Sequence, residues 1–186
     1  MSMAIDRCDI GINNLRFINL GCYETHMKSS QDSRNILNIP AANIAIIQSS
    51  WHREYSDKMF NKCKSVLARH GANTPLVHLL PGALELPYAA QFIVDSDSSI
   101  EAIIAFGIII KGETDHYQMV RDACLHGLLR VSLDCKIPII NEVLAVYTAE
   151  DAEKRCADDN FNKGLEAAYA AIEIIHWQRR LLSNET

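Results

Sequence analysis

The stretch EAIIAFGIIIKGETDHYQMV, residues 101–120, joins two patterns that decide the fold. Residues 101–110 are almost unbroken apolar sequence, which is typical of a strand buried on both faces. Residues 116–135, HYQMVRDACLHGLLRVSLDC, predict a long helix. The turn between the two is dense in polar, charged and proton-exchanging groups, namely Lys111, Glu113, Thr114, Asp115 and His116. Such a turn at the end of a buried strand indicates a functional site.

The alternation of strand and helix repeats on both sides of this stretch. Further strands are expected at residues 43–49, 74–80 and 137–146. Further helices are expected at residues 52–71, 88–95, 148–156 and 162–182. Apolar strands that alternate with helices predict a parallel sheet covered on both faces. With right-handed crossovers, the four strands form a flavodoxin-like α/β fold, a three-layer sandwich around a four-stranded parallel sheet.

The composition is that of an ordinary globular protein. Of the 186 residues, 48% are hydrophobic and 22% are charged, and this length suits one domain with a sizeable core. Residues 1–40 are polar and weakly periodic and end at Pro40, so we assign them to an N-terminal extension and residues 41–186 to the domain. The six cysteines are scattered without a C-x-x-C pair, and we expect them to be free and reduced.

Charge and hydropathy argue against several classes of partner. The net charge is -5 and no basic run is present, so nucleic acid is not an expected partner. No run reaches the roughly 20 apolar residues that span a bilayer. Asp6, Arg7 and Asp9 occupy the place where a signal peptide needs an apolar core, which predicts a cytoplasmic protein. The glycines form neither G-x-G-x-x-G nor a P-loop, so a dinucleotide or nucleoside triphosphate site has no support.

Four segments are expected to meet at the carboxyl ends of the strands, where open parallel sheets bind ligands. They are SSWHRE, PGALELP, KGETDH and the region of Tyr147 and Thr148. In KGETDH, Gly112 leaves room for a close turn, and Thr114 or Asp115 can cap the helix that follows. Free N–H groups at that helix start suit a phosphate, and the helix end favours a neutral His116 that accepts and returns protons. The alternative is that Thr114 and Asp115 act only as caps.

Two further residues have both a functional and a structural interpretation. Glu85 is a lone carboxylate in an apolar segment, so it either binds a polyol or accepts backbone N–H groups of its own chain. Trp51 directly follows a strand and either offers a flat face to a heterocycle or packs in the core. The residues alone leave both choices open.

The order and spacing of three pieces resemble the 6,7-dimethyl-8-ribityllumazine synthase family. The pieces are PGALELPYAA, FGIIIKGETDHYQMV, and IPIINEVLAVYTAEDAEKRC followed by NKGLEAAYAAIE. The resemblance covers about residues 43–180 and leaves the first 40 residues outside. It implies that 5-amino-6-(D-ribitylamino)uracil condenses with L-3,4-dihydroxybutan-2-one 4-phosphate, with loss of phosphate and water. It also implies that no metal or other cofactor takes part.

The resemblance implies a role for each matching residue. It assigns proton transfer to His116. It assigns binding of the butanone phosphate to Gly112, Glu113, Thr114, Arg155 and Lys163. In the family, the counterpart of Arg155 reaches into the active site of a neighbouring subunit. It assigns binding of the pyrimidine and its ribityl chain to Trp51, Ala83, Leu84, Glu85, Ile108, Ile109, Ile110 and Asn141.

Several positions depart from the usual pattern of the family. Trp51-His52 stands where Phe-Asn is usual, while Leu84 and Asn141 stand at positions that are often aromatic. Phe161 replaces the glycine that usually precedes NKG. The Trp-His pair and Asn141 are similar to the less common second type of the family. These departures raise an alternative function, a shell protein that binds a flavin or a lumazine with little catalysis.

The resemblance also implies an assembly. Members of the family form pentamers, pairs of pentamers or sixty-subunit capsids with active sites between subunits, and riboflavin synthase is a further candidate partner. Because the counterpart of Arg155 acts across the subunit interface, we expect at least a pentamer.

Overall fold

The structure, a computed structural model, describes residues 37–183. Residues 37–40, the only described part of the predicted extension, lie against the domain: Ile39 is fully buried, and its N–H donates to the carbonyl of His70 at 2.9 Å. The carbonyl of Leu37 lies 2.5 Å from His70 Nδ1. His70 is therefore a packed residue of the domain, as its place on the apolar stripe of its helix predicts.

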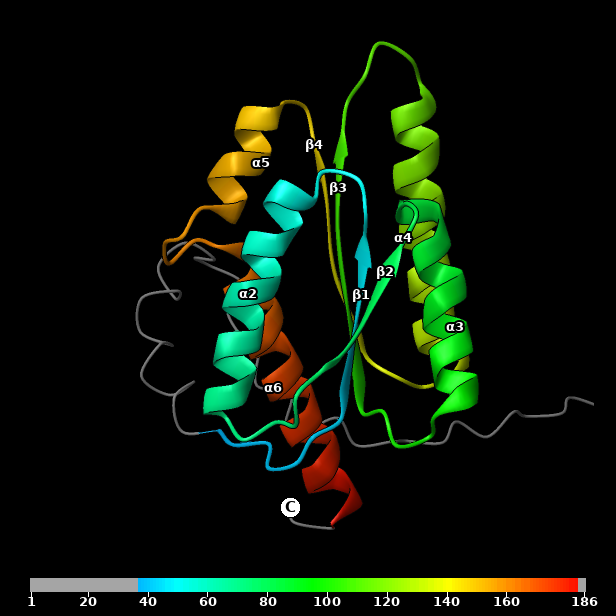
Figure 1. The fold of residues 1–186 in the computed structure, drawn as a ribbon. Helices are drawn as coiled ribbons and strands as arrows, with labels where there is room; N and C mark the ends of the chain where they lie inside the picture. The colour runs from blue at the N-terminus through cyan, green and yellow to red at the C-terminus, as the bar shows by residue number, and fades with distance from the viewer. Residues whose placement is uncertain (1–36, 184–186) are drawn as a thin grey trace, which may run out of the picture. The chain divides into compact units, whose positions relative to one another are not determined.

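The sheet has the four parallel strands that the sequence predicts. They are β1 (Ile44–Ser49), β2 (Leu76–Leu80), β3 (Ala102–Ile110) and β4 (Ile139–Val146), in the spatial order β2-β1-β3-β4. β1 pairs with β2 and with β3, and β3 pairs with β4 along eight residues from Ile103 to Ile110. Because all four strands run in the same direction, their carboxyl ends meet at one edge of the sheet (Figure 1).

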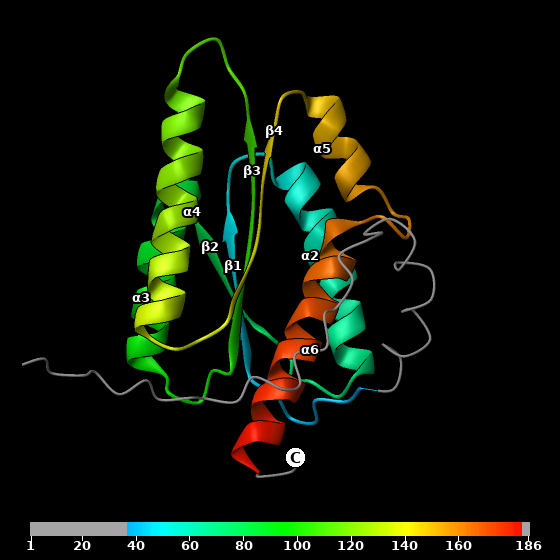
Figure 2. The same cartoon turned by 180° about the vertical axis from the view of Figure 1, so that it is seen from behind.

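Helices cover both faces of the sheet, so the three-layer α/β sandwich is confirmed. The helices are α2 (Arg53–Arg69), α3 (Leu86–Ser96), α4 (His116–Asp134), α5 (Ala149–Cys156) and α6 (Lys163–Leu182), with a 3-10 turn, η1, at Ala83–Glu85. α3 and α4 lie on one side of the sheet, and α2, α5 and α6 on the other, as both views show (Figures 1 and 2). α3 begins two residues before the expected 88–95 because Pro87 suits a first turn and η1 leads into it.

Two cores result, one on each face of the sheet. β3 is buried along its length up to Ile109, and its residues alternate between the two cores. Phe106, fully buried, packs toward α2 and α6, whereas Ile103 packs toward α3 and α4. Even-numbered residues of β4 such as Ile140 and Leu144 contact the first core, and odd-numbered residues such as Val143 contact the second.

Two glycines have a structural role, one in helix packing and one in ending a helix. A Cβ on Gly164 would lie 2.0 Å from the carbonyl oxygen of Met59, so the start of α6 approaches α2 more closely than a side chain permits. Gly71 ends α2 with a φ of 85°, in the left-handed region, as expected of a C-terminal cap. The NKG motif therefore has a packing reason for its glycine.

The cysteines of the described part are free, as predicted: Cys63, Cys124, Cys135 and Cys156. Cys8 and Cys22 lie outside residues 37–183. Among the helices of these residues, none is long and apolar enough to cross a membrane.

Candidate active site

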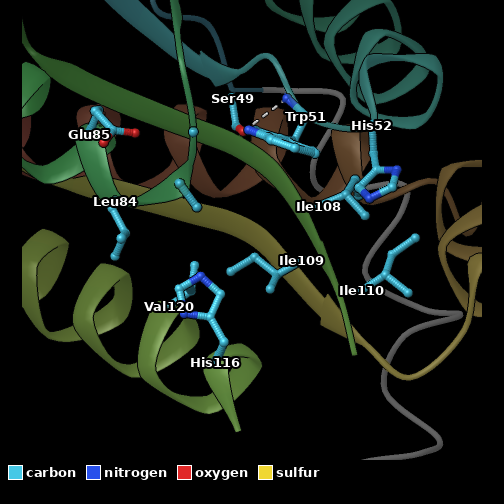
Figure 3. Close-up of a pocket in the computed structure, with 12 residues that line it drawn as sticks. Ser49, Trp51, His52, Leu84, Glu85, Ile108, Ile109, Ile110, His116 and Val120 are labelled. Atoms are coloured by element: carbon cyan, nitrogen blue, oxygen red, sulfur yellow. Dashed lines mark hydrogen bonds between the residues drawn. The ribbon is translucent and has the colours of Figure 1, made fainter. Parts of the chain in front are cut away.

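A pocket of about 400 Å³ lies at the carboxyl ends of β1 and β3. Its walls come from the segments after β1 and β2, from the end of β3 and from the first turns of α4 (Figure 3). The lining residues are Ser49, Trp51, His52, Gly82, Ala83, Leu84, Glu85, Ile108, Ile109, Ile110, His116 and Val120. Three of the four segments predicted to converge at this edge therefore do so.

His116 enters the pocket because the turn KGETD closes directly onto α4. The N–H of Lys111 donates to the carbonyl of Val146 at 2.9 Å, which is the last bond between β3 and β4. The chain then leaves the sheet, and α4 begins at His116. The imidazole points from this first turn toward the end of β3 (Figure 3). The strand end and the helix start thus hold a proton-exchanging group over an apolar wall.

The turn forms only part of the expected cap. The hydroxyl oxygen of Thr114 accepts from the N–H of His116 at 3.4 Å, a long bond, and the side chain of Asp115, the N-cap residue, forms no capping bond. Of the two residues predicted as possible caps, Thr114 makes this bond and Asp115 makes none. A Cβ on Gly112 would meet no atom within 4 Å, so packing within the described chain does not require this glycine. The turn is open rather than closed by its own side chains.

Trp51 lies on the surface of the pocket, not in the core. Its side chain is 68% exposed, so the core interpretation is wrong. The backbone N–H of Trp51 donates to the hydroxyl oxygen of Ser49 at 3.3 Å. The indole ring passes beside Gly82, where a Cβ would lie 3.6 Å from Trp51 Cδ1. A flat indole face is therefore available to a ligand across the end of β3 from His116 (Figure 3).

Glu85 lies beside Trp51 on η1. Its Oε2 would be 3.0 Å from a Cβ on Gly82, so carboxylate and indole flank the same glycine. The side chain is exposed, and within residues 37–183 it makes no hydrogen bond. The interpretation that Glu85 accepts backbone N–H groups of its own chain is therefore wrong, and its oxygens face the pocket free to accept from a ligand.

Several predicted site residues do not line this pocket. Arg155 lines a separate hollow of about 410 Å³ beside Tyr147 and Asp151, next to the end of β4. Lys163 is the first residue of α6, and its Nζ lies 2.5 Å from Oε2 of Glu166.

Asn141 and three residues of the turn are also outside the pocket. The side-chain oxygen of Asn141 accepts from the backbone N–H of Val143 at 3.0 Å. The turn residues Gly112, Glu113 and Thr114 also stay outside the pocket lining. Within one chain, the predicted ring-binding and phosphate-binding groups are therefore only partly together.

The region after β4 adds an aromatic and cationic group to this edge. Lys111 Nζ lies 5.4 Å from the ring centroid of Tyr147, whose ring stacks on Tyr117 at 6.3 Å. The hydroxyl oxygen of Thr148 accepts from the N–H of Asp151 at 3.1 Å and caps α5. These contacts hold α5, and with it Arg155, at the carboxyl end of β4.

Four pocket residues were not predicted individually. Ser49 and His52 flank Trp51 in SSWHRE, a segment that the strand-end rule had selected. Gly82 belongs to PGALELP, selected in the same way, and Val120 lies one helical turn after His116. His52 has a φ of 56°, in the left-handed region, at the start of α2. Helical spacing from His116 was the signal that could have found Val120.

One half-buried carboxylate has a shifted pKa. Burial raises the pKa of Glu142, on β4, to about 7, while Lys163 and Arg155 act in the opposite direction and Glu166 adds to the rise. Among the described residues, no group of three or more His, Cys, Asp and Glu side chains is arranged to hold a metal ion.

Comparisons with known proteins agree on one family. A family profile for 6,7-dimethyl-8-ribityllumazine synthase matches residues 41–179. A protein of that name from Xanthomonas oryzae pv. oryzae (strain PXO99A) is 39% identical over 142 residues, which are 75% of this chain and 92% of the relative. One from Stenotrophomonas maltophilia (strain R551-3) is also 39% identical, over 144 residues, 76% of this chain and 92% of the relative.

Proposed function

The chain belongs to the 6,7-dimethyl-8-ribityllumazine synthase family, and from that premise we propose that the pocket at the carboxyl ends of β1 and β3 is its active site. The enzyme is a transferase of riboflavin biosynthesis that condenses 5-amino-6-(D-ribitylamino)uracil with L-3,4-dihydroxybutan-2-one 4-phosphate. The observation that carries the assignment is the placement of His116 and Trp51 on one apolar pocket.

Each step of this reaction needs a proton transfer, and no step needs a covalent bond between a substrate and the protein. The 5-amino group attacks the ketone and water leaves to give an imine; a C–H proton is then removed as phosphate departs. Loss of phosphate leaves an enol at the former hydroxyl-bearing carbon, and a proton returned to its terminal carbon converts it to a new carbonyl. The ribityl-bearing nitrogen attacks this carbonyl, and the ring closes with loss of a second water. The imidazole of His116, which points from the first turn of α4 toward the end of β3, is suited to accept and return these protons.

The pyrimidine is held by surfaces rather than by charges. The exposed indole of Trp51 offers one face to the ring, and the ends of Ile108, Ile109 and Ile110 form an apolar floor. Glu85, exposed and without a hydrogen bond in the described chain, can accept from the ribityl hydroxyls. Holding both reactants in register supplies much of the rate increase in such a reaction.

The phosphate site is completed between subunits. The turn Gly112–Thr114 leads into α4 at the pocket edge, whereas Arg155 and Lys163 lie on the side of β4 away from it. A guanidinium suits a two-point grip on phosphate, and one that cannot line its own pocket suits the pocket of a neighbour. We infer a homo-oligomer of at least five subunits, in the cytoplasm, with shared active sites; riboflavin synthase is a candidate partner.

Exposed apolar side chains support an assembly. Leu125, Leu129 and Leu133 follow one another at helical spacing on α4 and are 45%, 54% and 68% exposed. On α3, Tyr88 and Phe92 stack on each other at 6.3 Å, and both are exposed. Apolar rows on two neighbouring helices are typical of a surface that another subunit covers.

A second candidate function rests on the ring-binding wall. Leu84 and Asn141 offer no aromatic face, so among residues 37–183 Trp51 is the only Phe, Tyr or Trp side chain that lines the pocket. That arrangement suits a shell protein that retains a flavin or lumazine without much turnover. Tight riboflavin retention with negligible product would favour this function.

The two candidates separate in one assay. Purified protein is given both substrates, product formation is followed by the absorption of the lumazine, and light scattering gives the mass of the assembly. We expect steady turnover, no retained flavin and a mass of at least five chains. Flavin retention without turnover would favour the shell protein over the synthase. An active monomer would contradict a phosphate site shared between subunits.

A further inference from the structure

The turn that carries Trp51 is held on its strand side by β2. Ser50, the residue between β1 and Trp51, donates twice to the carbonyl oxygen of Leu80: its backbone nitrogen and its hydroxyl oxygen each lie 2.8 Å from that acceptor. The backbone N–H of Trp51 donates in turn to the hydroxyl oxygen of Ser49 at 3.3 Å. Hydrogen bonds therefore fix the chain up to the residue whose indole lines the pocket.

After Trp51 the backbone takes a conformation that needs support from its surroundings. His52 has a φ of 56° and a ψ of 42°, in the left-handed region. A residue with a side chain persists there where neighbouring structure holds it, and such residues gather at ligand sites. The carbonyl of His52 accepts from the backbone N–H groups of Tyr55 at 3.1 Å and of Ser56 at 3.4 Å. Contacts that fix the first turn of α2 therefore also fix the turn from which the indole of Trp51 projects.

Gln48, on β1, fixes the first turn of α2. It is 3% exposed and does not line the pocket. Its Nε2 donates to the hydroxyl oxygen of Ser56 at 2.8 Å and to Oδ1 of Asp57 at 2.6 Å, so both protons of the amide have an acceptor. Ser56 is fully buried, and the bond to the carboxylate of Asp57 is charge-assisted. Among residues 37–183, these are the side-chain hydrogen bonds that join β1 to α2.

We propose that Gln48 is a positioning residue that holds the indole of Trp51 toward the pocket before the pyrimidine binds. Because Gln48 does not line the pocket, it acts through the first turn of α2 and the left-handed turn at His52. Trp51 is 68% exposed, so packing in the core does not fix its ring, and the hydrogen bonds around its turn do so instead. A ring face that is ordered before binding loses less entropy when a ligand stacks on it. The inference rests on the proposed role of Trp51 in binding the ring.

Gln48→Met is the first test, because methionine has a similar length and lacks both donors. Calorimetry on the full-length protein gives the Kd for 5-amino-6-(D-ribitylamino)uracil. We expect the variant to bind about fivefold more weakly than the wild type, as for one side chain that must be ordered on binding. Val66→Ala is the matched control. Val66 is fully buried on the same helix, about 15 Å along it from Ser56, so this variant is destabilised but should keep the wild-type Kd.

A double-mutant cycle with Trp51→Ala separates positioning from a general loss of structure. If Gln48 acts through the indole, Gln48→Met has nothing left to misplace once the indole has been removed. The double variant should then bind the ribitylaminouracil with the same Kd as Trp51→Ala alone. A merely structural role would weaken binding by the same factor in both backgrounds, and that result would overturn the inference.

Kinetics give a second readout, and Asp57 gives a second pair of variants. In Gln48→Met, the KM for the ribitylaminouracil should rise, whereas kcat and the KM for the phosphorylated ketone should change little. If Gln48→Met does not fold, Asp57→Ala removes one acceptor of the same amide and should raise the same KM. Asp57→Asn keeps an acceptor oxygen at this position and should restore the wild-type value. Equal KM values in Asp57→Ala and Asp57→Asn would contradict the role of this hydrogen bond.

The outcomes separate this inference from the proposed function. An unaltered Kd in Gln48→Met, or an equal loss in Val66→Ala, would overturn the role of Gln48 and leave an active synthase intact. A wild-type Kd in Trp51→Ala would overturn this inference together with the ring-binding role of Trp51. Absence of product from a wild type that still binds the ribitylaminouracil would instead overturn the proposed reaction and leave the role of Gln48 standing.

Discussion

Two hollows of similar size lie at opposite ends of the same sheet. The pocket with His116 and Trp51 has about 400 Å³ at the carboxyl ends of the strands. A second hollow of about 430 Å³ lies near the amino end of β4, between the end of α4 and α6. It is lined by Ser132, Lys136, Ile137, Pro138, Ile139, Ile140, Ala170, Ile174 and Gln178. Volume alone does not distinguish them.

The difference lies in how the chain arrives at each end. At the carboxyl ends, strands run into turns that start helices, and these turns present an imidazole, an indole and free backbone N–H groups. At the amino end of β4, the chain passes from the end of α4 at Asp134 through Lys136 and Pro138 into the strand, and this hollow contains no imidazole or indole among the described residues that line it. The polar groups of the candidate site therefore lie at the carboxyl ends of the strands because there the chain passes from a strand through a turn into a helix.

Removal of the imidazole should have the largest effect. We expect His116→Ala to lower kcat by about 10²–10⁴-fold, the usual contribution of a positioned proton-transfer group, with little change in KM for either substrate. Steady-state kinetics with both substrates measure this. His126→Ala, on an exposed turn of the same helix, and Gln178→Ala, in the amino-end hollow, are the controls and should retain wild-type kcat. A large loss in Gln178→Ala would break the distinction between the two ends.

Removal of the guanidinium should act on binding more than on chemistry. A hydrogen bond between charged groups contributes about 1.5–3 kcal/mol, so Arg155→Ala should raise KM for the phosphorylated ketone about 10–100-fold. Its neighbour Lys154, which is paired with Glu150 and 67% exposed, offers a matched control in Lys154→Ala. An unaltered KM in Arg155→Ala would contradict the shared phosphate site.

The third test uses the two tryptophans of the chain, Trp51 and Trp177. Trp177→Phe leaves Trp51 as the single indole reporter, and its fluorescence should be quenched when the ribitylaminouracil binds. Trp51→Ala should weaken that binding about tenfold, in line with about 1–3 kcal/mol for stacking a base on an aromatic side chain. In Trp51→Phe, the remaining Trp177 on α6 should report no binding. A change in the fluorescence of Trp177 when the ribitylaminouracil is added would show that its ring binds away from Trp51.

The last test concerns stability rather than activity. Burial raises the pKa of Glu142 from its ordinary 4.5 to about 7, so its contribution to stability is present at low pH and is lost as pH rises between these values. Glu142→Gln lacks this loss. We expect its advantage in unfolding free energy over the wild type to grow by about 3 kcal/mol from pH 4.5 to pH 8. Thermal unfolding across this range would show parallel curves if Glu142 did not titrate there.

The fold was predictable because its signals are local and repeated. The apolar run that became β3, the stop at Gly71 and the regular strand–helix alternation all lie within short windows of sequence. Their positions confirm the parallel sheet and its two covered faces. The start of α3 was missed by two residues because Pro87 was interpreted as the end of a loop rather than as the first turn of a helix.

The site was predictable only in part, since it depends on contacts across the sheet. The strand-end rule selected the segments around Trp51, Glu85 and His116, and these meet. Sequence could not tell which neighbours enter the pocket, or that Arg155 lies beyond β4. Glu142 had one visible signal, a charge within the apolar run IPIINEVLAV, but its pKa depends on groups from two helices, α5 and α6, that only the fold brings near it.

Density for bound 5-amino-6-(D-ribitylamino)uracil, in a complex of the full-length protein without the ketone, tests the central claim most directly. We predict the ring against the indole of Trp51 and over Ile108–Ile110, with the ribityl chain along Ala83–Glu85 and the 5-amino group facing His116. A ring in the hollow at the amino end of β4, or at any place away from His116 and Trp51, would contradict the claim.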